Sequence, residues 1–99
     1  MVKRLKELHE AQLTAKTPAD IQRINDELQY IYAKRNGTIP AYRSQVIASR
    51  VAKKYSLDKQ IEILLNNNVD DIVTLKVYRV QVALDVDQMI NSFESQLQM

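Results

Sequence analysis

The chain has 99 residues, of which 45% are hydrophobic and 26% charged, and its formal net charge is +2. A chain of this length builds one domain around one modest core, and so apolar a sequence is not typical of a disordered protein. The absence of cysteine excludes disulfides, zinc–thiolate sites and thiol catalysis. It also favours a reducing compartment, so we expect a cytoplasmic protein.

The composition also indicates the fold class. Glycine occurs once and proline twice, too few for the many turns of a sheet protein. No uncharged apolar run approaches the ~18 residues of a membrane-spanning helix, and the basic first residues lack the apolar core of a secretory signal. We therefore expect no membrane association. The predicted fold is all-α, a single domain over residues 1–99 built as a compact bundle of four to five helices with a long C-terminal helix.

The first segment, about residues 2–15, predicts an amphipathic helix. Apolar residues recur at steps of three and four, which places them on one face of a helix. Charged residues fill most positions between them, so one side of this helix should be buried and the other solvated. The apolar face consists of Leu5, Leu8, Ala11 and Ala15.

A second helix, about residues 18–35, has clear signals at both ends. The Thr17 hydroxyl can accept a free backbone N–H as the N-cap, and Pro18 has no N–H to leave unpaired at the first helical position. Asp20 follows in the first turn, where the helix dipole favours negative charge. Gly37 can adopt the left-handed conformation that ends a helix. The apolar stripe of this helix consists of Ile21, Ile24, Leu28 and Ile31.

One short loop, residues 38–40, separates this helix from the next. The proline at its end is suited to open a third helix over about residues 40–55. Ser56 can then cap a short fourth helix, about residues 57–66, which the asparagines that follow would end. We expect the fourth helix to point three apolar side chains inward, namely Ile61, Leu64 and Leu65.

The last segment supports two opposed interpretations. Residues 78–87 alternate apolar and polar side chains and are rich in valine, which taken alone is typical of a β-strand. A wider window favours a helix capped by Asn68, because its apolar residues fall within an arc of about 120° at 100° per residue. No glycine or proline follows Pro40 to make a hairpin turn, so we predict one long helix. The apolar arc consists of Ile72, Leu75, Tyr78, Val82, Val86, Met89, Ile90, Phe93 and Leu97.

The same segment carries a second apolar stripe, placed roughly 100° round the helix from the first. Its residues are spaced by four, three and four: Val73, Val77, Val80 and Leu84. A helix that is apolar on two sides must be buried on both. It is either the central helix of the bundle, or it offers one side to a second copy or a partner helix in the manner of a coiled coil. This stripe is the candidate oligomer or partner interface.

Charge is distributed unevenly along the chain. Residues 1–59 hold 12 Lys and Arg against 6 Asp and Glu, whereas residues 60–99 hold 2 against 6. Such asymmetry occurs in nucleic-acid-binding proteins, in proteins whose copies attract each other, and by chance in soluble proteins. Basic residues on one side of the third helix could meet phosphates and release counterions, or could form a solvated face. The candidate nucleic-acid contacts are Arg43, Arg50, Lys53, Lys54, Lys59 and Gln60.

Residues 51–61 resemble the core of a helix-turn-helix motif. A small alanine lies in the first helix, the turn is short, and the second helix has a polar start. In that motif the first residues of the second helix enter the major groove, and here these are Asp58, Lys59 and Gln60. The sequence departs from the pattern at Ser56, where a glycine is usual, and at Glu62, where an apolar residue is usual.

The sequence carries no signal of catalysis. His9, the only histidine, lies among charged residues and is typical of a surface side chain, and no second His or Cys completes a metal set. One glycine cannot build a Gly-rich phosphate loop. Neighbouring acids such as Asp70 and Asp71 point apart on a helix, which suits cap charges better than a paired acid and base. We expect no enzyme, and no cofactor, metal or small-molecule substrate.

Two functions fit these patterns. The first is a non-enzymatic helical interaction or assembly module (an adaptor, an inhibitor or a structural component of a larger complex) that self-associates through its C-terminal helix. The second is a small DNA-binding regulator that uses residues 43–60 and dimerises through the same helix. Their dependence on salt separates them, since phosphate contacts make affinity fall steeply as salt rises.

Overall fold

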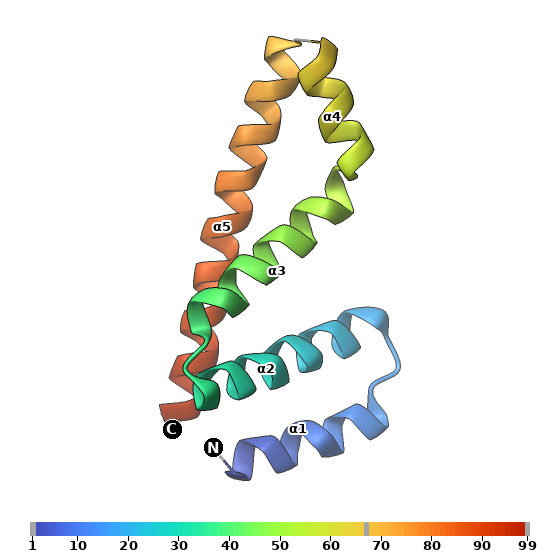
Figure 1. The fold of residues 1–99 in the computed structure, drawn as a ribbon. Helices are drawn as coiled ribbons and strands as arrows, with labels where there is room; N and C mark the ends of the chain where they lie inside the picture. The colour runs from blue at the N-terminus through green and yellow to red at the C-terminus, as the bar shows by residue number, and fades with distance from the viewer. Residues whose placement is uncertain (1, 67, 99) are drawn as a thin grey trace. The chain divides into compact units, whose positions relative to one another are not determined.

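A computed structural model describes residues 2–66 and 68–98, and within them it contains five α-helices and no strand. The helices are α1 (Val2–Thr14), α2 (Pro18–Asn36), α3 (Ile39–Lys54), α4 (Leu57–Asn66) and α5 (Val69–Gln98) (Figure 1). The predicted all-α fold with a long C-terminal helix is confirmed. The alternating segment 78–87 is helical, because burial along one side of a long helix outweighs the β-propensity of its valines.

The ends of the helices follow the predicted capping pattern. The Thr17 hydroxyl accepts a hydrogen bond from the backbone N–H of Asp20 at 3.2 Å, and Gly37 ends α2 with a φ of 70°. The side chains of Ser56 and Asn68 each accept from the backbone N–H three residues further on, at 3.2 and 3.5 Å. These contacts satisfy N–H groups that the start of a helix leaves unpaired.

The connection between α2 and α3 is shorter than the predicted loop at residues 38–40. Helix α3 begins at Ile39, so only two residues join the two helices. Pro40 then occupies the second helical position, where its missing N–H is still one that would lack an intrahelical partner. The N–H of Tyr42 donates to the carbonyl of Thr38 at 3.0 Å and closes the first turn.

Contacts divide the chain into two compact units, Met1–Tyr42 with Ile90–Met99, and Arg43–Met89. The first unit contains α1, α2 and the C-terminal end of α5. The second contains most of α3, all of α4 and the larger part of α5. The single domain expected over residues 1–99 stays a prediction.

In the first unit, α1 and α2 lie side by side and share a core (Figure 1). Leu97, near the end of α5, packs against this core. The predicted stripes of both helices face inward, except that Ile21 at the start of α2 is 45% exposed. The buried residues of the cluster are Leu8, Ile24, Leu28 and Ile31.

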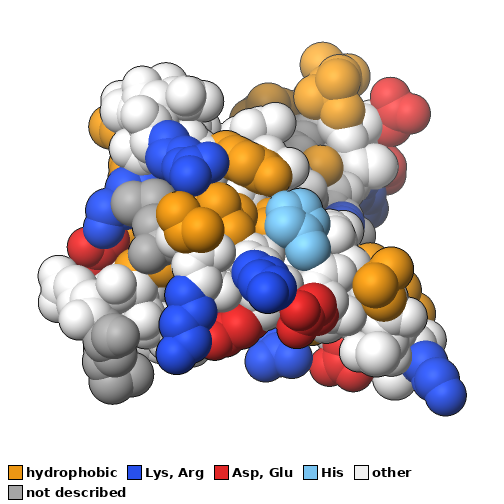
Figure 2. Space-filling view, turned by 90° about the horizontal axis from the view of Figure 1, so that it is seen from below, with side chains coloured by type: hydrophobic (Ala, Val, Ile, Leu, Met, Phe, Trp, Pro, Cys, Tyr) orange, Lys and Arg blue, Asp and Glu red, His pale blue; other side chains and the backbone are white. Residues whose placement is uncertain are grey.

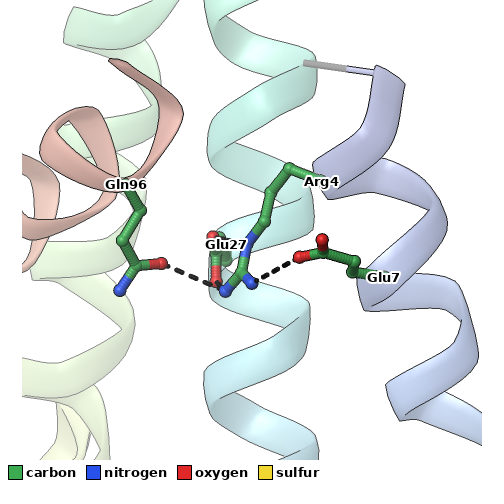
Figure 3. Close-up of polar contacts among 4 residues, drawn as sticks. All are labelled: Arg4, Glu7, Glu27 and Gln96. Atoms are coloured by element: carbon green, nitrogen blue, oxygen red, sulfur yellow. Dashed lines mark hydrogen bonds and ion pairs between the residues drawn. The ribbon is translucent and has the colours of Figure 1, made fainter. Parts of the chain in front are cut away.

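A buried carboxylate on α2 is held by an arginine of α1 (Figure 3). Glu27 is 3% exposed, and its two oxygens accept hydrogen bonds from Arg4 Nε at 2.6 Å and Nη2 at 2.7 Å. The same guanidinium donates to Glu7 at 3.2 Å and to the side-chain oxygen of Gln96 at 3.0 Å. The hydrogen bond with Glu27 is the main cause of a raised pKa at Arg4. This cluster ties α1 to α2 and to the end of α5.

An aromatic cluster completes the first unit. The centre of the Tyr30 ring lies 5.9 Å from the centre of the Tyr42 ring and 5.6 Å from that of the Phe93 ring. The Tyr30 hydroxyl donates to Glu94, which also accepts from Lys34 Nζ at 2.5 and 2.7 Å. Burial, aided by the bond to Glu94, raises the pKa of Tyr30 to about 12.

In the second unit, the apolar arc of α5 supplies most of the core. The buried residues are Val51, Ile63, Leu75, Val82 and Val86. Helix α4 contributes Ile63 in place of Ile61, Leu64 and Leu65, so the prediction that those three point inward is wrong. Gln60 lies on the same side of α4 as Ile63, and its side chain donates to the carbonyl of Tyr55 at 2.9 Å and accepts from Arg79 at 2.5 Å. The side of α4 that carries Gln60 and Ile63 therefore faces the unit.

Candidate functional site

The second apolar stripe lies on the exposed side of α5. Its members Val73, Val77, Val80 and Leu84 are 52%, 63%, 61% and 52% exposed. At 100° per residue, the centre of the stripe lies about 170° from the centre of the buried arc, not about 100°. The stripe is therefore not buried as one face of a central helix, and its role as an oligomer or partner interface stays a prediction.

Aspartates bound the stripe at both ends. Asp70 lies three residues before Val73, and Asp87 lies three residues after Leu84. The exposed carboxylate of Asp70 has no partner among the residues that the structure describes. Asp87 is paired with Arg43 of α3, whose Nε and Nη2 donate to its two oxygens at 2.5 and 3.1 Å. The hydrogen bond from Arg43 lowers the pKa of Asp87.

Helix α4 carries another exposed apolar face, which includes the three side chains predicted to point inward. Its members Leu57, Ile61, Leu64 and Leu65 are 70%, 45%, 61% and 76% exposed. Their spacing puts them on one side of the helix, so the amphipathic pattern was visible in the sequence. Only the tertiary contacts reveal that this chain leaves the face uncovered. This face is therefore a second candidate interaction surface.

The basic residues of α3 lie along α5. Arg43 is the partner of the aspartate that ends the stripe, and Arg50 Nη2 lies 3.2 Å from a methionine sulfur of α5. The carbonyl oxygen of Arg50 accepts from the Tyr78 hydroxyl at 3.4 Å, and Lys54 Nζ lies 6.0 Å from the centre of the Tyr78 ring. Lys53 is the exposed neighbour of Lys54 in the last turn of α3. Much of the predicted basic stripe is thus engaged in holding α3 against α5.

The predicted helix-turn-helix segment does contain two helices joined by a two-residue turn, α3 and α4. At the start of α4, Lys59 Nζ lies 3.7 Å from a Glu62 oxygen. The side chain of Gln60, the residue expected to contact a base, is hydrogen-bonded to the carbonyl of Tyr55 and to the side chain of Arg79. Both of these bonds would have to break before Gln60 could reach a base edge.

Charged side chains of both signs are mixed on the molecular face drawn in Figure 2. Lys and Arg side chains lie there among Asp and Glu side chains. His9 is exposed, as predicted, and its Nδ1 lies 3.3 Å from the side-chain oxygen of Gln12. Mixed charge of this kind provides weak attraction for a polyanion.

A shallow groove in the second unit has mainly apolar walls. It is lined by Ile47, Ala48, Val51, Gln60 and Arg79. Its two polar residues bond to each other. Within residues 2–66 and 68–98, no group of three or more His, Cys, Asp or Glu is placed to hold a metal ion.

None of the helices in the described part of the chain is long and apolar enough to cross a membrane. No protein-family model, no curated protein and no solved structure matches the chain.

Proposed function

We propose that the chain is a non-catalytic helical assembly module that binds a second copy of itself, or a helical protein partner, through the stripe on α5. The observation that carries the proposal is the exposure of Val73, Val77, Val80 and Leu84, each more than half exposed on one side of a continuous helix. Their spacing of four, three and four matches the seam of two packed helices. Exposed apolar side chains gathered on one helix face are candidates for a protein–protein interface.

The size of the stripe suits reversible association. Fully burying one valine or leucine is worth roughly 1.5–3 kcal/mol, so eight half-exposed side chains in two copies supply about 6–12 kcal/mol. The loss of translational and rotational freedom on association costs roughly 4–15 kcal/mol. Because the two ranges overlap, we expect a dimer with a dissociation constant of about micromolar or weaker.

The exposed face of α4 supports the same class of function. A chain of 99 residues with one apolar face on α5 and another on α4 is suited to join other polypeptides, as an adaptor, an inhibitor or a structural component of a larger complex. The absence of cysteine is compatible with action in the cytoplasm.

The alternative, a DNA-binding regulator acting through residues 43–60, stays a prediction. We favour assembly because Arg43, Arg50 and Gln60 contact other residues of their own unit. A base contact would have to break the bonds of Gln60, and Asp87 offsets the positive charge of Arg43 that would attract a phosphate.

Sedimentation velocity over a range of about 1–200 μM tests the proposal. We expect the sedimentation coefficient of the wild-type protein to rise with concentration. Val77→Glu and Leu84→Glu should remain monomeric while keeping the helical circular dichroism spectrum. Leu13→Glu is the matched control, because Leu13 is an isolated apolar residue that is 87% exposed on α1. A wild-type protein that stays monomeric throughout, or stripe variants that unfold, would refute the proposal.

A further inference from the structure

The stripe on α5 has the same spacing in both directions along the helix. From Asp70 to Asp87 its positions follow at steps of three, four, three, four and three. An antiparallel copy of the helix therefore places Val73 opposite the partner's Leu84 and Val77 opposite the partner's Val80. A parallel copy places each residue opposite itself. Apolar contact alone does not choose between these orientations.

The charges at the ends of the stripe favour the antiparallel orientation. In a parallel pair, Asp70 lies beside the partner's Asp70, at two adjacent helix N-termini that also carry Asp71. Like charges at neighbouring positions repel, and parallel helix dipoles add to that repulsion. In an antiparallel pair, Asp70 meets the other end of the stripe, where Asp87 is already neutralised by Arg43.

Arg43 has donors to spare for a second carboxylate. It binds Asp87 through Nε and Nη2, and neither of these bonds uses Nη1. A guanidinium carries five N–H groups, so one carboxylate does not saturate it. The side chain of Arg43 is 41% exposed, which leaves it accessible to an approaching copy.

We infer that two copies of this chain pair through α5 in antiparallel orientation, with Asp70 of each copy bound to the partner's Arg43. The inference rests on the proposed self-association and adds its orientation and its polar contacts. The inference also gives Arg43 a role at the interface, because its guanidinium binds Asp87 of the same copy and Asp70 of the second copy. The dimer is closed by a two-fold axis between Val77 and Val80, so both ends form the same contact.

Disulfide mapping tests the orientation, since the chain has no cysteine of its own. In the antiparallel pair, two Val73→Cys copies hold their thiols about 16 Å apart along the helices, too far for a disulfide, which needs Cα atoms within about 7 Å. The same holds for two Leu84→Cys copies. An equilibrated mixture of the two variants should instead give the mixed dimer under mild oxidation, with the 73–84 link identified by mass spectrometry. Leu13→Cys reports the background of collisional disulfides.

A pair of charge variants tests the polar contact. Asp70→Asn should weaken dimerisation by about two- to twenty-fivefold, since an exposed ion pair changes an equilibrium by up to about fivefold and the two-fold axis repeats it. Asp71→Asn is the matched control, because it removes the same charge from the same helical turn and keeps an oxygen that can accept from Asn68. The dimer of Asp70→Asn should also lose less affinity on addition of salt than the wild-type dimer does.

The possible failures are distinct. Disulfide-linked dimers of Val73→Cys alone would overturn the antiparallel orientation and leave self-association intact. A protein that sediments as a dimer but forms no disulfide above the Leu13→Cys background in any combination would overturn α5 as the interface. Equal affinities for Asp70→Asn and Asp71→Asn would overturn the contact with the partner's Arg43. A monomer at all concentrations would instead refute the proposed function itself.

Discussion

Replacing Arg4 with alanine should destabilise the first unit more than any change at a solvated charge. Arg4 supplies two hydrogen bonds, of 2.6 and 2.7 Å, to the carboxylate of Glu27. The Glu27 side chain is 4% exposed, whereas that of Arg4 is 31% exposed. Arg4→Ala therefore leaves a negative charge buried between α1 and α2 without its cation.

The magnitude follows from that burial. Removing one partner of a buried ion pair costs about 3–5 kcal/mol, because the remaining charge stays desolvated. Arg4 lies partly in solvent, and water can enter the place of its side chain, so we expect the lower end, about 3 kcal/mol. The exposed bond from Arg4 to Glu7 adds less than about 1 kcal/mol. A loss of about 3 kcal/mol is a large fraction of a total stability of about 5–15 kcal/mol.

Urea unfolding followed by circular dichroism measures the effect as a change in the free energy of unfolding. Arg23→Ala is the matched control, since Arg23 lies 3.9 Å from Asp20 with both side chains more than half exposed. We expect that control to cost less than about 0.5 kcal/mol. The double variant Arg4→Met with Glu27→Leu should recover most of the lost stability, because apolar side chains of similar volume need no desolvated charge.

Two results would refute this reasoning. One is an Arg4→Ala variant no less stable than Arg23→Ala, which would mean that Glu27 is solvated. The other is a double variant as unstable as Arg4→Ala, which would mean that the loss comes from packing of the arginine stem and not from the unpaired charge.

Gly37→Ala should lower the unfolding free energy by about 1–2 kcal/mol, since a φ of 70° strains an L-residue while nothing within 4 Å crowds the new Cβ. The pKa of Glu94 is lowered, chiefly by the hydrogen bond from Lys34, so its contribution to stability is present at neutral pH and is lost as pH falls through the folded-state pKa. Glu94→Gln should therefore flatten the fall in unfolding free energy below about pH 5. The pKa of Tyr30 is raised to about 12, so its contribution is present below pH 10 and is lost as pH rises toward 12, and Tyr30→Phe should remove the last phenolate to form in an alkaline absorbance titration. Duplex DNA at ~50 mM salt should show no binding by fluorescence anisotropy below ~100 μM, and a salt-sensitive affinity that Arg50→Ala weakens would restore the DNA-binding alternative.

Much of the secondary structure could be predicted from residues close together in the sequence. Thr17 and Gly37 mark the ends of α2, and Ser56 and Asn68 mark the starts of α4 and α5, because a cap acts on backbone groups within four residues. The buried arc of α5 was also predictable, since helical periodicity accumulates over its whole length. Because these signals depend only on residues close together in the sequence, they can be recognised without knowing the fold.

The tertiary structure alone decided which apolar faces are covered. Helices α4 and α5 each have more apolar surface than the folded chain buries, and α4 buries Ile63 while Ile61, Leu64 and Leu65 stay exposed. The ion-pair partners of the charged residues could not be predicted from the sequence either. Arg43 and Asp87 lie 44 residues apart in the chain, and Arg4 and Glu27 lie 23 apart. Burial and ion pairing depend on groups that meet only after folding. Several apolar faces compete for few neighbouring helices, and the sequence of one helix does not reveal which face will be covered. That competition leaves the stripe of α5 exposed, and with it the surface on which the proposed assembly depends.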